Sequence, residues 1–500
     1  MALESGISEK LAFYKACGDI NEQIKVSIKT DVESEQIKRV VSVVPEARLN
    51  KKEIIDGSLR VTGVVTFYIC YINFDGEIKK CECGNSFDTK ITLTEKVDKC
   101  LVRLSIDKSE VDLSGINLSV VAYVNVRAKC EREETTHAIM GGEDFIIKRK
   151  EIEYPKCIGV VEGSLPLSEE IEVDYVVNEI IMQRANAVVT SSVAGVGVVI
   201  VDGVVYFSTI LLQSGEKKDI MVIRKSIPFR FEIECEEAMP NYLAQATAFI
   251  KTLKTDVSVD EEKKVSLLNV ETVLRVEAEC VSLKTMETAS DLFSLTNEVS
   301  LKRFSFECLN KGEMRSIIKS INTVVGLDDS VKEIVCVNGE NAEVLSYSIT
   351  ENGILATGVL SFHAFYLNQE GEPVCKRLET PFEENLGVIE NLSECKISVC
   401  LTNLTIEKQT SEQLETRFEC VFSLYPAERR QVGIITEANL GELKTPPKYP
   451  LSVYIGKANE EEWDLAKRLN VTPTELIETN KELCFPLTGE ERIVVYRQKK

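Results

Sequence analysis

The chain has 500 residues, of which 44% are hydrophobic and 28% charged, and it carries a formal net charge of −21. This length is too great for one hydrophobic core and predicts roughly three or four domains of ordinary globular composition. Because so negative a surface repels phosphate backbones and anionic headgroups, general binding to nucleic acid or to a membrane surface is disfavoured.

The amino-terminal segment carries acidic residues early and has no long apolar core, so we do not expect a secretory signal. The longest apolar runs are strand-length, well below the roughly 20 residues that a membrane-spanning helix needs. We therefore expect a cytoplasmic protein without direct membrane insertion.

The sixteen cysteines are spread singly along the chain, and only two histidines, His137 and His363, accompany them. The nearest pair, Cys81 and Cys83, is too closely spaced for a zinc knuckle. The cysteines are therefore interpreted as reduced thiols that act as small hydrophobic side chains. No metal-binding residue is predicted.

In chain order, residues 1 to about 30 suggest a short amphipathic helix followed by a strand over residues 23–28. A β-type run over residues 37–44 is expected to end at Pro45. Residues 54–72 then alternate between apolar and polar, which is typical of a half-buried antiparallel strand.

That strand contains a motif that occurs three times. A glycine begins a β-branched run that ends in phenylalanine, a Gly-Glu pair follows at a hairpin turn, and a further phenylalanine closes the block. The three copies are Gly63–Phe67 with Gly76 and Phe87, Gly203–Phe207 with Gly215 and Phe229, and Gly358–Phe362 with Gly371 and Phe382. Such spacing predicts an internal repeat. The first glycine would form a bulge or let a neighbouring side chain pack on bare backbone, and the second would take a positive φ in the turn.

Each repeat contains about seven or eight short strand signals and few helical periods, which predicts a mainly β chain of β-sandwiches or flattened barrels. The predicted units are an N-terminal segment with the first repeat (1–155), a second repeat (156–315) and a third repeat (316–440). A charged stretch over residues 256–264 is expected to be an exposed hairpin loop.

The character of the sequence changes after the third repeat. Residues 441–449 form a proline-rich linker, and residues 450–500 predict a small α+β domain of strand, helix, helix and strand (βααβ). Its strands are expected at 451–455 and 492–496, and its helices at 460–469 and 473–480. Thr472, Pro473 and Glu475 form a capping box that begins the second helix.

This tail resembles a LysM domain over roughly residues 450–497, through Trp463-Asp464-Leu465-Ala466 and the elements Val471-Thr472, Glu475-Leu476 and Asn480. The triple repeat resembles the SPOCS domain of clostridial spore-coat proteins. Three SPOCS units before one LysM domain is the arrangement of the SipL-type family of spore-coat morphogenetic proteins.

The resemblance implies a non-enzymatic scaffold or adaptor without cofactors, on the mother-cell side of the forespore surface in the spore coat. Its implied partner is a coat-basement morphogenetic ATPase, bound mainly through the LysM-like domain. The candidate partner-binding residues are Trp463, Lys467, Arg468, Ile477, Glu478 and Asn480. Trp463 is either an interface anchor or the aromatic that fills a small core, and the core role is favoured. A charged helix face is more often simply solvated.

Two other classes of function stay open. A wall protein that binds peptidoglycan or chitin-type glycans through the LysM-like domain is disfavoured. Its usual turn motifs are replaced by residues 456–459 and 486–489, and no signal peptide is recognised. A hydrolase with an acidic pocket would need two converging carboxylates. We find no P-loop, dinucleotide fingerprint, zinc-protease or serine-hydrolase motif, so no catalytic or cofactor-binding residue is predicted.

Overall fold

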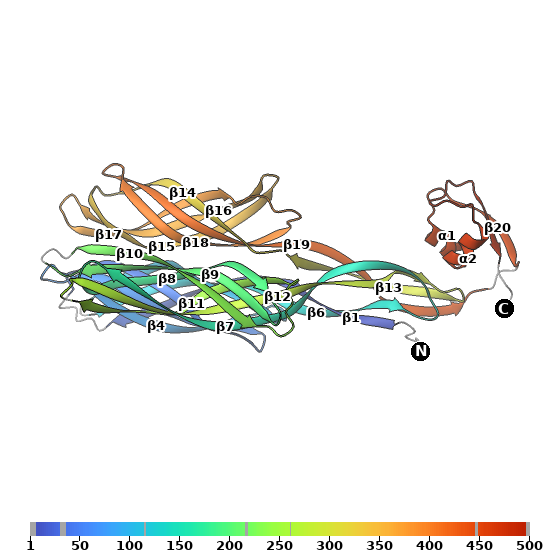
Figure 1. Cartoon of the computed structure of the whole chain (residues 1–500), viewed down its shortest axis with the longest axis horizontal. Coiled ribbons are helices and arrows are strands. Elements are labelled where there is room, and N and C mark those ends of the chain that lie inside the picture. Colours follow the sequence, from blue (N-terminus) through green and yellow to red (C-terminus); the bar gives the residue numbers. More distant parts are fainter. Residues whose placement is uncertain are drawn as a thin grey trace.

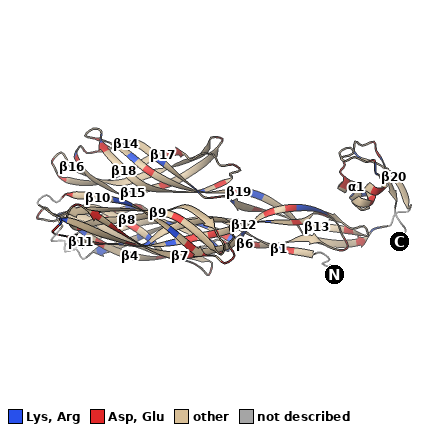
Figure 2. Ribbon diagram, viewed as in Figure 1, with Lys and Arg blue, Asp and Glu red and all other residues tan. Residues whose placement is uncertain are grey.

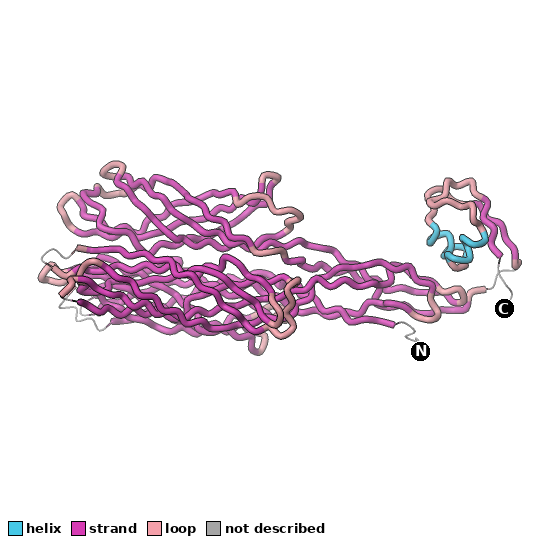
Figure 3. Tube along the Cα trace, in the orientation of Figure 1, coloured by secondary structure: helices cyan, strands magenta, loops and turns pink. Residues whose placement is uncertain are grey.

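The computed structural model describes residues 7–30, 37–114, 117–215, 219–260, 262–445 and 449–496. They form an elongated molecule made mostly of strands, and the helices of this described part lie in a small domain near the C-terminus (Figures 1 and 3). The sheets of the described residues are small and antiparallel, and none of them closes on itself. The prediction of a mainly β chain is confirmed, with open sheets in place of the flattened barrels that were the alternative.

The strands fall into three sets, one for each repeat. The first set is β1 (Ile7–Thr30), β2 (Arg39–Ile55), β3 (Ser58–Ile72), β4 (Ile78–Thr92), β5 (Lys99–Ser114) and β6 (Asn117–Gly141). The second is β7 (Ile146–Val173), β8 (Val177–Ala194), β9 (Val198–Gln213), β10 (Ile220–Glu234), β11 (Leu243–Asp260) and β12 (Val265–Phe293). The third is β13 (Asn297–Lys311), β14 (Arg315–Gly326), β15 (Val331–Thr350), β16 (Gly353–Asn368), β17 (Pro373–Asn385), β18 (Glu394–Lys408) and β19 (Gln413–Leu443).

Each repeat is built from two sheets. Three consecutive strands form one sheet, in the orders β2-β3-β4, β8-β9-β10 and β15-β16-β17. The first and last two strands of the repeat form the other, in the orders β1-β6-β5 and β7-β12-β11. In the third repeat the first strand is broken into β13 and β14, and both pair with β19, as does β18. The two sheets of a repeat share one apolar core, which in the first repeat joins Phe67 of β3 to Val124 of β6.

The repeated motif forms the central strand of the first sheet, and its glycine is required by packing. Gly63 pairs with Phe87 across β3 and β4. A Cβ atom on Gly63 would lie 2.5 Å from both the Arg48 carbonyl oxygen and Cζ of Phe87. Gly203 and Gly358 are covered in the same way by Phe229 and Phe382. The ring of the closing phenylalanine therefore rests on bare backbone, as one of the two alternatives predicted. The second glycines of the motif, Gly76, Gly215 and Gly371, have the predicted positive φ, while Glu216 lies outside the described residues.

The three repeats pack against one another around a common axis. Cys70, Ile210 and Phe365 each lie seven residues after the first glycine of their motif (63 to 70, 203 to 210, 358 to 365), and they meet in one buried cluster. The members of this cluster that come from β3, Tyr68 and Cys70, belong to the strand face that alternation marks as the more polar one. That face is buried because neighbouring repeats cover it.

Beyond this body, the antiparallel strand pairs β1/β6, β7/β12 and β13/β19 continue together as a stalk (Figure 1). Apolar residues of all three strand pairs form its core, where the rings of Phe13 and Phe306 stack with centroids 3.9 Å apart. Where the stalk leaves the body, the β1–β6 and β12–β7 pairings shift register, and β13 gives way to β14. Acidic and basic residues are interspersed over body and stalk (Figure 2).

Several local predictions were wrong. From Ile7 on, where the described residues begin, the segment expected to form an N-terminal helix belongs to β1, because it pairs with β6. Pro45 does not end its strand but lies inside β2, at the edge of its sheet, where a missing N–H is tolerated. The expected loop over residues 256–264 is strand as far as Asp260.

The domain boundaries stay a prediction. The position 155/156 lies within β7, and the position 315/316 lies at the start of β14.

The small C-terminal domain comprises β20 (Leu451–Ile455), α1 (Glu462–Leu469), α2 (Pro473–Thr479) and β21 (Arg492–Tyr496), in the predicted order. Of the predicted linker, residues 441–443 belong to β19 and residues 446–448 lie outside the described part of the chain. Among the described residues, no helix is long and apolar enough to cross a membrane.

Candidate functional site

The C-terminal domain is organised by local signals that the sequence displays. Thr472 Oγ1 accepts a hydrogen bond from the Glu475 backbone N–H at 3.1 Å, and Glu475 accepts one from the Thr472 N–H at 3.1 Å. This capping box begins α2 as predicted. Leu465, Ala466 and Leu476 then pack against Ile493 and Val495 of β21.

Trp463 is buried, but against the stalk and outside the apolar cluster of its own domain. Its indole Nε1 donates to Oδ2 of Asp291 in β12 at 2.8 Å, and its ring meets Phe293 edge-on with centroids 5.3 Å apart. Lys467 Nζ lies 2.7 Å from the same carboxylate oxygen. Two of the six predicted contact residues thus hold their domain to the stalk.

The joint has further polar support. Asn470 Nδ2 donates to the Leu295 carbonyl at 2.7 Å, and Lys444 Nζ donates to Asn470 Oδ1 at 2.8 Å. Burial alone would raise the pKa of Asp291, but hydrogen bonds from Lys467 and Trp463 outweigh that effect and lower it. The carboxylate is therefore charged at neutral pH and holds α1 by charge-assisted hydrogen bonds.

The other predicted contact residues divide between structural and exposed positions. Arg468 forms a two-pronged ion pair with Glu460, at 2.7 and 2.8 Å. Asn480 bridges α2 to β21 by donating to the Val494 carbonyl and accepting from the Val494 N–H, both at 2.7 Å. Ile477 and Glu478 are exposed on α2, with 43% of Ile477 accessible.

Sequence reasoning missed an exposed apolar surface on the same domain, which we call the ribbon face: Leu451, Val453 and Ile455 of β20 with Tyr496 of β21. These side chains are 57–60% exposed, and Leu451 pairs directly with Tyr496. Leu451, Val453 and Ile455 alternate along β20, which places them on one face of the strand. Tyr454 on the opposite face is also hydrophobic, so the sequence alone does not show which face is exposed. In Figure 1 this strand lies on the side of the domain farthest from the body.

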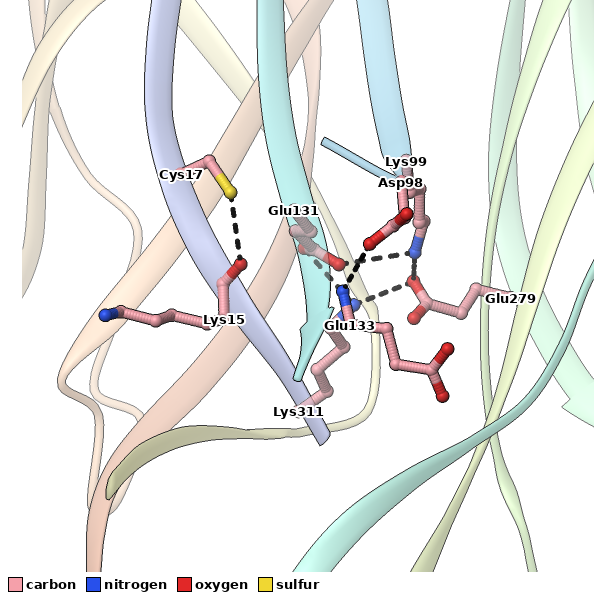
Figure 4. Close-up of polar contacts among 8 residues, drawn as sticks. All are labelled: Lys15, Cys17, Asp98, Lys99, Glu131, Glu133, Glu279 and Lys311. Atoms are coloured by element: carbon pink, nitrogen blue, oxygen red, sulfur yellow. Dashed lines mark hydrogen bonds and ion pairs between the residues drawn. The ribbon is translucent and has the colours of Figure 1, made fainter. Parts of the chain in front are cut away.

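A second polar feature lies where the three repeats meet at the base of the stalk (Figure 4). Glu279 of the second repeat lies 2.5 Å from Lys99 of the first and 2.7 Å from Lys311 of the third. Glu131 of the first repeat completes the group, at 3.5 Å from Lys99 and 3.6 Å from Lys311. We call these four residues the axial clamp.

The axial clamp is internally neutral. Burial would raise the pKa of Glu279, but the ammonium groups of Lys311 and Lys99 outweigh it and hold the pKa below its ordinary value. Each cation faces two carboxylates and each carboxylate two cations, so the group links the repeats and leaves no charge uncompensated. Within the described chain, no group of three His, Cys, Asp or Glu side chains is placed to hold a metal ion.

A scan against protein-family models, a search of curated proteins and a search of solved structures found no match to the chain.

Proposed function

We propose that the chain is a non-enzymatic scaffold in spore-coat assembly and that its LysM-like domain binds a coat-basement morphogenetic ATPase at the forespore surface. The proposal rests on the resemblance of the triple repeat to SPOCS domains and of the tail to a LysM domain. The observation that carries the binding role is the ribbon face, an apolar surface presented at the end of the stalk. Adjacent exposed apolar side chains of this kind mark sites of protein association.

Two features of the tail favour this role over glycan binding. The turns at residues 456–460 and 487–489 close on each other, because the Asn459 N–H donates to the Leu487 carbonyl at 2.8 Å and the Leu487 N–H donates to the Glu460 carbonyl at 3.0 Å. In wall-binding LysM domains the corresponding turns lie near the sugar groove. The ribbon face is also aliphatic except for Tyr496, whereas sugar sites rely on polar groups that fix orientation.

The test is co-purification of the ATPase from sporulating cells with wild-type chain and with Val453→Asp. Val453 is 60% exposed, so the charge enters solvent without disturbing the domain core. The matched control is Val388→Asp, at a residue 61% exposed in the third repeat. Loss of the ATPase only in Val453→Asp is expected.

Retention of the ATPase by a chain that lacks residues 445–500 would refute the LysM-like domain as principal contact. Capture of the full chain by insoluble peptidoglycan, abolished by the same deletion, would instead establish the glycan-binding alternative.

A further inference from the structure

Two contiguous cavities lie between the three repeats, with volumes of about 210 and 300 Å³. They share Glu46, Ala47, Leu104, Asn186 and Asn341 in their walls, so they form one space, which we call the axial cavity. Strands of all three repeats line it. About 10–15 Å³ suffices for a single water molecule, so a polyatomic ligand fits.

The charge of this wall contrasts with that of the whole chain. Arg48, Arg103, Arg184 and Arg377 line the axial cavity, and Glu46 is its one carboxylate among the lining residues that the structure describes. Glu46 is already engaged, because its Oε2 lies 2.9 Å from Arg48. Arg377 pairs with Glu379 at 2.7 Å. In a protein of net charge −21, the interior is thus locally positive.

Three polar atoms in the wall of the smaller cavity lack any partner among the described residues. They are Ser105 Oγ, Arg184 Nε and His363 Nδ1, and each is buried. One comes from each repeat. A guanidinium cannot shed its charge, so an unpaired buried arginine requires a compensating group from outside the chain.

Arg103, which lines the larger cavity, also lacks a compensating negative charge. It makes no hydrogen bond or ion pair with another described residue, and burial lowers the pKa of its guanidinium. Asn186 and Asn341 add amide groups to the wall that both cavities share. The site therefore offers two uncompensated cations together with neutral hydrogen-bond donors.

We propose that the axial cavity binds an oxyanion that carries two or more negative charges, of phosphate or polycarboxylate type. The planar fork of arginine matches the oxygen pairs of both groups. Two unpaired guanidinium groups favour a multivalent anion over chloride. Because all three repeats supply its wall, the anion would bind only to the assembled body and would stabilise it.

The test is equilibrium urea unfolding of the full chain, monitored by circular dichroism. An anion that binds only the folded body raises the urea midpoint. The probes are inorganic phosphate and citrate at low millimolar concentration, with sodium chloride at matched ionic strength as the reference. We expect a rise of the urea midpoint that saturates with phosphate, with citrate or with both, which also identifies the type of anion. Low concentrations matter because phosphate and similar salts stabilise proteins generally when concentrated.

Arg184→Gln is the test variant, and Arg230→Gln is its control in the same repeat, at a residue 62% exposed. Arg184→Gln should unfold in chloride at the wild-type urea concentration or higher, because it removes an uncompensated charge. It should need at least about tenfold more anion for the same midpoint shift, whereas Arg230→Gln should respond as wild type does. Arg103→Gln provides a second variant with the same expectation.

The proposal is overturned if neither anion gives a saturable shift in the wild-type chain. Equal shifts in wild type and in both cavity variants would overturn it as well, because the stabilisation would then be a general salt effect.

Discussion

Phe87 lies directly on Gly63, and this contact explains why the same two residue types recur in all three repeats. Gly63→Ala would drive a Cβ into the Arg48 carbonyl oxygen, a backbone atom that cannot turn away. We expect this substitution to lower the free energy of unfolding by roughly 1–3 kcal/mol, as overpacking commonly does. Urea unfolding measures the change.

The matched control is Gly433→Ala, also within a strand, where nothing lies within 4 Å of an added Cβ. It should leave the free energy of unfolding within about 0.5 kcal/mol of wild type. Equal losses in the two variants would mean that the aromatic contact is not what demands glycine.

His363 gives a prediction for acid conditions. Burial, together with the charges of Arg377 and Arg184, lowers the pKa of His363 to about 4 from its ordinary 6.5. Between these values the unfolded chain takes up a proton that the folded chain does not, so acid favours unfolding. Relative to His363→Asn, the wild type should lose roughly 3 kcal/mol of stability as the pH falls from 6.5 to 4. Urea midpoints across that range in chloride test this, and parallel losses in both proteins would contradict it.

At the scale of elements, a single carboxylate, that of Asp291, accepts the side-chain hydrogen bonds of both Trp463 and Lys467 of α1. Asp291→Ala should release the C-terminal domain, because Trp463 and Lys467 would both lose their acceptor. Trp463 is the one tryptophan of the chain, so its fluorescence reports the joint directly. We expect a red-shifted emission and easier quenching by acrylamide.

Asp256→Ala serves as the control, since Asp256 is 56% exposed and pairs only locally with Lys254. An Asp291→Ala emission spectrum identical to that of the control would show that the domain stays docked by other contacts.

Elements marked by local chemistry could be read from the sequence, and those set by distant partners could not. The capping box of Thr472 and Glu475 located the start of α2, and the recurring glycines identified the central strands of the repeats. Segment 7–22 carries a helix-like pattern yet forms a strand, because β6 supplies hydrogen-bond partners more than a hundred residues away. The acceptor of Trp463 lies 172 residues away, which no local pattern indicates.

At the scale of the whole molecule, the axial clamp ties the three repeats together. Glu279→Gln would leave Lys99 and Lys311 sharing only the more distant Glu131. Removing one partner of a buried ionic group typically costs about 3–5 kcal/mol, and we expect a loss of free energy of unfolding in that range. Glu437→Gln, which breaks the exposed pair with Lys302, should change the stability by less than about 0.5 kcal/mol. Comparable losses in the two variants, measured by urea unfolding, would argue against the clamp.

The meeting of Cys70, Ile210 and Phe365 has a consequence for how the chain can vary. Three identical subunits around an axis would have to place the same side chain there three times. In one continuous chain the three positions can differ, and here they hold a small side chain (Cys70), a medium one (Ile210) and a large one (Phe365). A gain of volume in one repeat can therefore be offset by a loss in another. The three repeats therefore differ in the side chain that each contributes to this cluster. Exchanging the order of the repeats would disturb packing that depends on all three.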